Sequence, residues 1–251
     1  MTTPGNALVT GGARRIGREI ARALARDGWN IAVHCHRSQS EAEETARELA
    51  SLGVKACVLT GDLSRAQTAR DLLDAANQRL GTLTCLVNNA SWFEFDDLAS
   101  LEAERLDRHL GVNLRAPLLL TQEFSRRLPE TAKGCVINLL DQKVFNLNPD
   151  FLSYTLSKVA LQGATQTLAM ALAPRIRVCA VAPGITLVSG RQSEENFARA
   201  HQDAPLGQSS SPQDIAEAVR YLVRADSVTG ETLLVDGGQH LWPRRRDVQF
   251  A

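Results

Sequence analysis

A tyrosine and a lysine stand four residues apart in the segment SYTLSK, as Tyr154 and Lys158. The surrounding pattern predicts a helix, in which this spacing places both side chains on one face. A tyrosine has an ordinary pKa of about 10, so alone it is a poor acid–base group at neutral pH. The ammonium of a neighbouring lysine favours the phenolate and is expected to lower the pKa of the tyrosine. The two residues therefore form a candidate acid–base pair.

A glycine-containing turn, TGGARRIG, is the second candidate site. It follows a short apolar run and opens a helical pattern, which is the context of a dinucleotide-binding turn. The N–H groups and the dipole at a helix start favour a pyrophosphate, whereas an arginine there costs about 0.3–1 kcal/mol. Two arginines are explained if a multiply charged anion binds, although they could also be solvated side chains. We predict cofactor contacts at Gly11, Arg14, Arg15, Ile16 and Gly17.

The end of the next apolar run, HCHRSQS, bears on which nucleotide binds. A site for NAD places Asp or Glu about 20 residues after the glycine turn, where it holds the ribose hydroxyl. Arg37 stands at that distance from Gly17, and no carboxylate occurs before Glu41. His36, Arg37 and Ser38 offer a cation and a hydroxyl suited to a 2′-phosphate. The sequence therefore predicts NADPH rather than NADH.

These residues are carried by a regular alternation of short apolar runs and helical patterns. Strands are expected at residues 6–11, 30–36, 54–61, 84–90, 134–141, 176–184 and 232–238. Helices are expected at residues 15–27, 41–52, 66–80, 102–128, 154–173 and 212–224. Near-continuous apolar runs are typical of parallel strands covered on both faces. The alternation predicts one α/β domain over residues 1–251, a Rossmann-type doubly wound sheet of seven parallel strands flanked by helices.

Two polar segments lie outside this alternation. Residues 187–211 precede the last helix at the expected carboxyl edge of the sheet, where ligands bind. They form a candidate substrate lid, with a plain surface loop as the alternative. The charge run in the tail WPRRRDVQFA is interpreted as solvated.

Composition excludes several classes of function. The formal net charge is +0 over 251 residues, which argues against a nucleic-acid or membrane surface as partner. The segment MTTPGNALVT lacks the features of a signal peptide, and no apolar run approaches the length of a membrane span, so a cytoplasmic protein is expected. The five cysteines form no C-x-x-C pair and are expected to be buried and reduced. No metal-ligand spacing occurs among histidines and cysteines, so no metal site is expected.

Taken together, the motifs resemble the short-chain dehydrogenase/reductase family over nearly the full length. The matches are the glycine turn, GDL, NNA, Asn113, the tyrosine–lysine pair, PG and VDGG. The resemblance implies that Asn113, Tyr154 and Lys158 form the catalytic and water-relay set. It places Asp62 at the adenine and Thr186 at the carboxamide end of the cofactor. The implied cofactor contacts beyond the first turn are Asp62, Leu63, Asn88, Asn89, Ala90, Ser91, Pro183, Gly184 and Thr186.

Three departures from the family pattern point to one branch of it. Asp141, thirteen residues before Tyr154, replaces the usual serine; Arg15 replaces a glycine of the turn; and NNAG has become NNAS at Ser91. These changes are similar to the pteridine reductase branch, whose members reduce pterins with NADPH. Bacterial relatives in that branch act as dihydromonapterin or dihydrofolate reductases. The resemblance also implies a homotetramer with two long helices at its interfaces.

The chemistry of Asp141 agrees with this branch. An ionised carboxylate would repel the oxyanion that develops when a carbonyl is reduced. Reduction of a pterin C=N bond instead makes a ring nitrogen basic, and Asp141 could orient or reprotonate Tyr154 as it donates to that nitrogen. Asp141 could alternatively cap a turn at the strand end. The resemblance assigns Phe93 in NNASWFEF to stacking on the pterin, and we expect Arg15 and Ser91 to face the substrate, whereas Phe93 and Trp92 could alternatively anchor the loop.

We therefore predict an NADPH-dependent reductase of pterin-like substrates that uses Asp141, Tyr154, Lys158 and Asn113. One alternative is a short-chain reductase of another carbonyl or imine, since a fold does not fix a substrate. The other is a non-catalytic NADPH-binding sensor.

Overall fold

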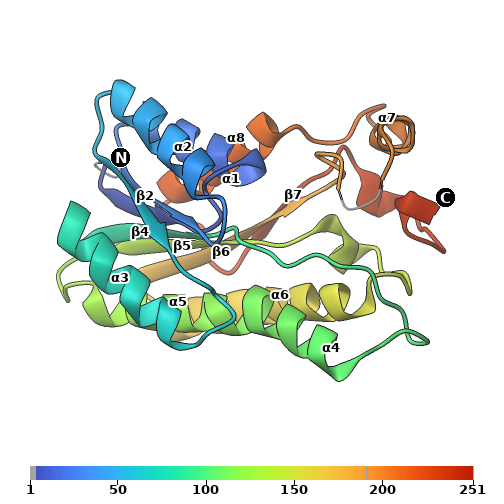
Figure 1. Ribbon diagram of the computed structural model, residues 1–251, viewed down its shortest axis with the longest axis horizontal. Helices are drawn as coiled ribbons and strands as arrows, with labels where there is room; N and C mark the ends of the chain where they lie inside the picture. Colours follow the sequence, from blue (N-terminus) through green and yellow to red (C-terminus); the bar gives the residue numbers. More distant parts are fainter. Residues whose placement is uncertain (1–3, 190–191, 251) are drawn as a thin grey trace.

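A single sheet of seven parallel strands forms the centre of the molecule (Figure 1). The computed structural model describes residues 4–189 and 192–250. The strand order is β3-β2-β1-β4-β5-β6-β7, as in a doubly wound sheet, so the predicted fold is confirmed. The strands are β1 (Asn6–Val9), β2 (Asn30–Cys35), β3 (Ala56–Thr60), β4 (Leu83–Asn88), β5 (Gly134–Leu139), β6 (Ile176–Pro183) and β7 (Thr232–Val235).

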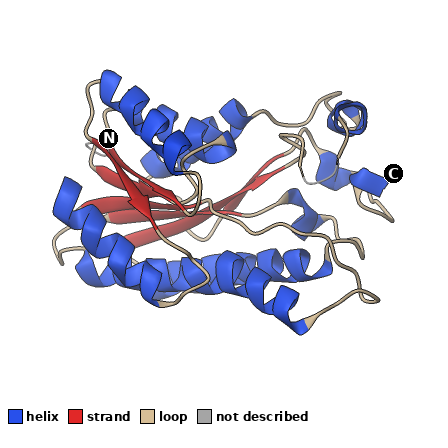
Figure 2. Cartoon of the chain, in the orientation of Figure 1, coloured by secondary structure: helices blue, strands red, loops and turns tan. Residues whose placement is uncertain are grey.

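Helices cover both faces of this sheet, which gives three layers (Figure 2). One face carries α1 (Arg15–Arg26), α2 (Gln39–Ser51) and α8 (Pro212–Arg224). The other face carries α3 (Gln67–Leu80), α5 (Ala116–Arg127) and α6 (Leu152–Leu172). Right-handed βα crossovers on either side of β1 account for this division.

Two apolar cores separate the layers, and neighbouring residues of one strand enter different cores. Val9 packs with Ile20 of α1 and Val219 of α8, whereas Leu8 packs with Phe124 of α5 on the opposite face. Successive side chains in a strand point to opposite faces, so each central strand must be apolar at every position. This requirement explains the continuous apolar runs in the sequence.

The helix predicted over residues 102–128 is present over residues 103–127, but it contains a π-helical turn that the sequence did not predict. The structure has α4 (Ala103–Leu110), a π-helical turn (Gly111–Arg115) and then α5. A π turn adds one residue to the helical repeat and is frequent at functional sites. Here it carries Asn113, which is buried.

Residues 187–211 contain a short helix, α7 (Glu194–Gln202), beside the carboxyl ends of the strands (Figure 1). The side chain of Ser193 caps α7, and Ser211 forms a capping box with Asp214 at the start of α8. Residues 190 and 191 of this candidate lid lie outside the described residues. So do residues 1–3 and 251 of the two terminal segments considered above.

The segment WPRRRDVQFA is not a solvated charge run, which corrects the interpretation from the sequence. Arg244 forms an ion pair with Asp203 after α7, and Arg246 forms one with Asp150 before α6. The tail also contains a 3-10 turn (Val248–Phe250). These ion pairs hold the end of the chain against the carboxyl edge of the sheet.

Across the described residues, no helix has both the length and the apolar character needed to cross a bilayer. The same residues contain no group of three or more His, Cys, Asp or Glu side chains that could hold a metal ion. All five cysteines are free thiols; four are buried as predicted, and Cys57 is half-buried.

Candidate active site

The structure brings together the acid–base residues predicted from the sequence. Tyr154 and Lys158 lie on the face of α6 that packs toward the end of β5. Asp141 follows β5, and its Oδ2 accepts a hydrogen bond of 2.8 Å from Oη of Tyr154. Nζ of Lys158 donates to the carbonyl of Leu139 at 2.7 Å and lies 5.7 Å from the ring centroid of Tyr154. The end of β5 and one face of α6 thus bring Asp141, Tyr154 and Lys158 together.

The expected influence of Lys158 on Tyr154 is wrong in this arrangement. Burial raises the pKa of Tyr154 well above its ordinary value, and the charge of Asp141 raises that pKa further. Burial also lowers the pKa of Lys158 to about 8, against the opposing effect of Asp141. The carboxylate is hydrogen-bonded to the phenol, whereas the ammonium is not, so the carboxylate dominates. Tyr154 consequently keeps its proton and is poised as a donor.

Asp141 both caps a turn and accepts a hydrogen bond from Tyr154, while its part in proton transfer stays a prediction. Its Oδ1 accepts a hydrogen bond of 2.9 Å from the backbone N–H of Lys143 and caps the 3-10 turn Gln142–Phe145. Its Oδ2 is left for Tyr154. Burial raises the pKa of Asp141 above its usual value, against the hydrogen bonds from Lys143 and Tyr154, which lower it. The carboxyl therefore has an increased tendency to hold a proton beside the phenol.

Asp96 positions the start of α6 and was missed from the sequence. It is fully buried, and its Oδ1 accepts a hydrogen bond of 2.9 Å from the N–H of Ser153, while its Oδ2 accepts from the hydroxyl of Ser153. Its own carbonyl accepts from the N–H of Leu152 at 3.1 Å. Asp96 thus caps the start of α6 at Ser153, the residue before Tyr154, from a loop that is remote in sequence. Only the three-dimensional fold reveals this partner.

Asn113 holds the loop after β4 against α6. Its Oδ1 accepts from the N–H of Trp92 at 2.7 Å, and its Nδ2 donates to the carbonyl of Trp92 at 2.9 Å. Nδ2 also donates to Oγ of Ser157, and Oγ of Ser91 donates to Oδ1. The side chain makes no hydrogen bond to Tyr154 or Lys158 within the described chain. Its predicted place in a water relay and the predicted contacts of Ser91 with ligands stay predictions.

Phe93, which the resemblance assigns to stacking on the substrate, lies beside Tyr154. Its ring stacks on Phe151 with centroids 4.5 Å apart and planes at 16°, and it meets the ring of Tyr154 edge-on at 4.7 Å. Phe93 remains 37% exposed, so part of its ring is accessible. Trp92 is covered instead by the guanidinium of Arg108 at 4.4 Å from the ring, which supports a loop-anchoring role for Trp92.

The glycine turn after β1 has room for glycine alone at two positions. Gly11 has a φ of +62°, and a Cβ on Gly17 would lie 2.2 Å from the carbonyl oxygen of Gly11. Asn89 locks the turn, since its Nδ2 donates to the carbonyl of Thr10 at 2.8 Å. Oγ1 of Thr10 in return accepts from the N–H groups of Asn89 and Ala90. The turn and the loop after β4 therefore form one cradle at the switch point of the sheet, which suits a pyrophosphate.

Arg15 holds a strained position in this cradle. Its φ is +57°, a left-handed conformation that costs a residue with a Cβ about 1–2 kcal/mol. Its Nη2 donates to the carbonyl of Val188 at 2.8 Å and so joins the turn to the start of the candidate lid. Burial lowers the pKa of Arg15, and the charge of Arg14 lowers it further. Ile16 is half-buried against the core below this turn.

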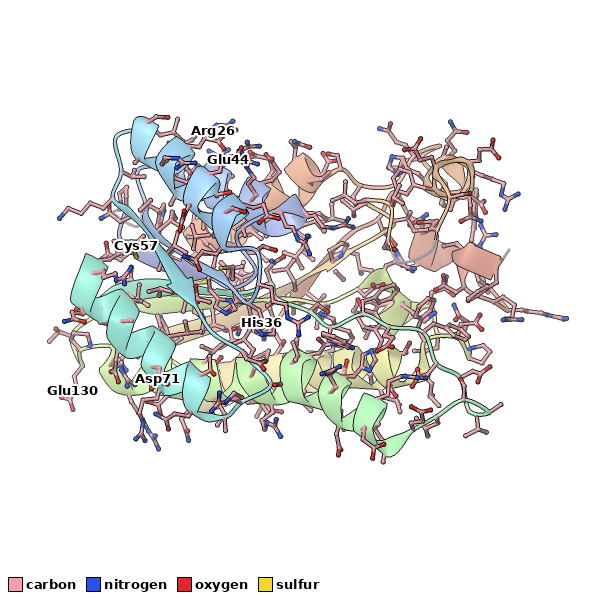
Figure 3. The ribbon with its side chains drawn as sticks, in the orientation of Figure 1. Arg26, His36, Glu44, Cys57, Asp71 and Glu130 are labelled. Atoms are coloured by element: carbon pink, nitrogen blue, oxygen red, sulfur yellow. The ribbon has the colours of Figure 1, made fainter. Side chains whose placement is uncertain are left out.

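The residues after β2 form a cationic rim at the same edge. Arg14 and Arg37 are exposed, and neither forms an ion pair with a carboxylate in the part of the chain that the structure describes. Nε2 of His36 lies 3.9 Å from Oδ2 of Asp62, and Figure 3 labels His36 between the two helical layers. Ser38 precedes α2, and its side chain makes no capping hydrogen bond. Unneutralised cations at this place fit the phosphates of a nucleotide.

The remaining predicted cofactor residues lie at strand ends on this edge. Asn88 ends β4 and is buried, and Leu63 is buried after β3. Pro183 ends β6, and a Cβ on the following Gly184 would lie 2.4 Å from Oγ of Ser209. Oγ1 of Thr186 bonds to the carbonyl of Gly184 and to Oγ of Ser210, each at 2.9 Å. The predicted set therefore converges on one site, while its contacts with a cofactor stay predictions.

Gln239 is a further residue of this region that sequence reasoning missed. It is buried, and its Oε1 accepts from the N–H of Ile185 at 3.0 Å. Its Nε2 donates to the carbonyl of Ala200 in α7 at 2.9 Å. Gln239 thus ties the loop after β6 to the candidate lid.

Comparison with known proteins places this geometry in a family. Residues 5–198 match the family described as short chain dehydrogenase. The chain belongs to the short-chain dehydrogenase/reductase family. An uncharacterised oxidoreductase of Methylorubrum extorquens is 37% identical over 92% of this chain and 96% of its own length. A granaticin polyketide synthase putative ketoacyl reductase of Streptomyces violaceoruber is 35% identical over 94% of this chain and 96% of its own.

Two solved structures are more similar still. The alternative dihydrofolate reductase FolM of Brucella canis, complexed with NADP, is 44% identical, with a TM-score of 0.90 over 96% of both chains. Its counterpart from Brucella suis, also with NADP, is 43% identical, with the same TM-score over 97% of this chain and 98% of that one. The predicted resemblance to the pteridine reductase branch is confirmed by these two neighbours.

Proposed function

We propose that this protein is an NADPH-dependent reductase that reduces a C=N bond of a pterin-like substrate, such as a dihydropterin or dihydrofolate. The hydrogen bond from Oη of Tyr154 to the carboxyl of Asp141 carries the proposal. It presents a neutral phenol next to a group that can return the proton. The structures of two alternative dihydrofolate reductases with NADP, at 43–44% identity, support it.

NADPH fits the cradle and its cationic rim. The glycine turn offers backbone N–H groups to the pyrophosphate, and Arg37 stands where a carboxylate would select NADH. Arg14, Arg37 and Ser38 would hold the 2′-phosphate, and Lys158 would hold the nicotinamide ribose. Bound NADPH supplies the hydride that reduces the carbon of the C=N bond.

The proton comes from the chain itself. Tyr154 donates its proton to the ring nitrogen, which becomes an amine as the carbon receives the hydride. The phenolate that remains regains a proton from solvent, and Asp141 relays it, because burial raises the pKa of its carboxyl. One hydride and one proton convert C=N to CH–NH and leave NADP⁺, and the proton that Tyr154 gave up is replaced from solvent.

The surroundings favour a flat heterocycle over a simple ketone. The exposed part of the Phe93 ring offers an aromatic surface beside the phenol. A ketone would develop negative charge on oxygen next to the carboxyl of Asp141, which is unfavourable when that group is ionised. A pterin nitrogen gains a proton there instead.

The test is NADPH oxidation by the purified protein with dihydrofolate and a set of dihydropterins, compared with simple ketones and a 3-oxoacyl thioester. The proposal expects dihydropterins or dihydrofolate to give the highest kcat/KM, and Tyr154→Phe to lower it by about 10²–10⁴-fold while NADPH still binds. Preferred reduction of the ketone or thioester would overturn the substrate class. Turnover unaffected in Tyr154→Phe would overturn the assignment of the proton donor, and no turnover of any substrate would favour the sensor alternative.

A further inference from the structure

The last residues of the chain contact three parts of the candidate site. We call residues 243–250 the C-terminal tail. The N–H of Asp247 donates to Oδ2 of Asp150 at 2.7 Å, next to the ion pair of Arg246 with the same carboxylate. The carbonyl of Val248 accepts from Nδ2 of Asn196 in α7 at 3.3 Å. In Figure 1 the C-terminus accordingly lies beside α7.

Phe250 of the tail extends a stack of aromatic rings that begins at the substrate face. Phe93 stacks on Phe151 as described, and Phe151 in turn stacks on Phe250, with centroids 6.1 Å apart and planes at 25°. Phe95 meets Phe151 and Phe250 edge-on at 5.2 Å and 5.1 Å. Three nearly parallel rings thus run from Phe93 to Phe250 in the tail. The middle ring is buried and has a left-handed backbone, with φ of +55°.

Asp247 connects the tail to the turn that holds Asp141. The side chain of Lys143 is buried, and its Nζ donates to Oδ2 of Asp247 at 2.8 Å and to Oδ1 of Asn148. The backbone N–H of the same lysine donates to Oδ1 of Asp141. A buried ammonium needs an opposite charge, and the tail supplies it. Loss of Asp247 would therefore disturb the residue that fixes Asp141.

We propose that the C-terminal tail is a positioning element of the substrate site. Phe250 holds the stacking ring of Phe93 through Phe151, and Asp247 holds Asp141 through Lys143. The tail therefore acts on substrate binding through one residue and on proton donation through the other. This inference rests on the proposed function for the identity of the stacked substrate, but not for the contacts themselves.

The kinetic test compares Phe250→Ala, Phe250→Leu and Phe250→Tyr with Leu241→Ala as control. Leu241 is 65% exposed just before the tail and is not one of the stacked rings. An aromatic pair is worth about 0.5–1.5 kcal/mol, so Ala and Leu are expected to raise KM for the dihydropterin about 2- to 10-fold. Phe250→Tyr and Leu241→Ala keep the wild-type KM, and all four keep the wild-type affinity for NADPH. Asp247→Asn is expected to lower kcat more than it raises KM.

A second readout does not depend on turnover. Trp92 adjoins Phe93, so acrylamide quenching of its fluorescence reports on the loop. Trp242→Phe removes the exposed tryptophan just before the tail, and Trp29 is buried. In that background, Phe250→Ala and Phe250→Leu are expected to increase quenching, and Leu241→Ala is not. If the wild type reduces no pterin, the proposed function fails while quenching still decides the role of the tail. Wild-type quenching in both variants, or wild-type KM in both where pterins are reduced, would overturn the inference.

Discussion

At the residue scale, the position of one proton decides the chemistry. The phenol of Tyr154 and the carboxyl of Asp141 both have raised pKa values because they are buried together, and they share a hydrogen bond. The sequence predicted that these two residues and Lys158 would meet. It did not predict whether Asp141 or Lys158 controls the pKa of Tyr154, because spacing cannot show that the carboxyl, rather than the ammonium, is hydrogen-bonded to the phenol.

Asp141→Asn tests how much the buried carboxyl of Asp141 lowers the free energy of unfolding. The pKa of Asp141 is raised in the native state, so the native protein binds more protons than the unfolded chain between the ordinary carboxyl pKa, about 3.9, and the raised value. The contribution of Asp141 to the free energy of unfolding therefore falls as pH rises through that window and remains unfavourable at neutral pH. We expect Asp141→Asn to lose turnover but to match or exceed wild-type stability at neutral pH in urea unfolding.

The same comparison in acid completes the test. Below the ordinary carboxyl pKa both states are protonated at this site, and any advantage of the variant should shrink. Asp107→Asn is the matched control, because Asp107 is exposed on α4 and makes no ion pair in the described chain. An Asp141→Asn protein that is less stable than wild type at neutral pH, and relatively more stable in acid, would contradict the direction of the shift.

Arg37 tests the choice of nucleotide. A hydrogen bond to a charged group contributes about 1.5–3 kcal/mol, so Arg37→Ala should weaken NADPH binding about 10- to 100-fold and leave NADH binding unchanged. Arg47→Ala removes one exposed cation from the neighbouring α2 and is expected to change neither affinity. Titration of each variant with both nucleotides provides the measurement. An equal loss for NADPH and NADH would show that Arg37 does not read the 2′-phosphate.

At the element scale, strand and helix ends place the side chains. The seven strands and most helices follow from alternation of apolar runs, because parallel strands covered on both faces must be apolar throughout. The π turn at Gly111–Arg115 and the cap from Asp96 could not be predicted, since one depends on packing against α6 and the other on a residue distant in sequence. The trajectory of the tail was missed for the same reason: its partners, Asp150 and Asp203, are found only in the folded chain.

Gly17→Ala tests the close approach at the start of α1. A Cβ there would lie 2.2 Å from the carbonyl oxygen of Gly11 and 2.5 Å from Nδ2 of Asn89, so the turn must open. Overpacking of this kind costs about 1–3 kcal/mol, and NADPH affinity should fall with it. Arg26→Ala, at the exposed far end of the same helix and labelled in Figure 3, is expected to change neither. Thermal unfolding with and without NADPH measures the stability and the NADPH affinity of each variant. A Gly17→Ala protein with the stability and NADPH affinity of the wild type would contradict the close approach at this turn.

At the scale of the whole molecule, the sheet order brings distant segments to one edge. Residues after β1, β2, β4, β5 and β6, together with the tail, meet outside the carboxyl ends of the strands. The doubly wound topology explains this convergence, because ligands bind where the strand order reverses. Apolar side chains on α6 remain exposed, among them Leu156, Val159 and Met170. They are candidates for the tetramer interface that the family resemblance implies.

We expect a homotetramer in analytical ultracentrifugation. Burial of Leu156 and Val159 in an interface would make aspartate at these positions unfavourable, so the double variant Leu156→Asp, Val159→Asp should sediment as a smaller species. Leu52→Asp, at the exposed end of α2, is expected to leave the tetramer intact. A monomeric wild type at micromolar concentration would contradict the predicted assembly.

The most direct test of the central claim is the ratio of kcat/KM for a dihydropterin to that for a simple ketone, measured with NADPH in the wild type and in Asp141→Ser. Serine restores the neutral hydroxyl that the family usually places there and removes the group that we propose returns a proton to Tyr154. The account predicts a ratio well above one in the wild type that falls by about 10²-fold or more in the variant. A wild type that prefers the ketone, or a ratio that the substitution leaves unchanged, would contradict it.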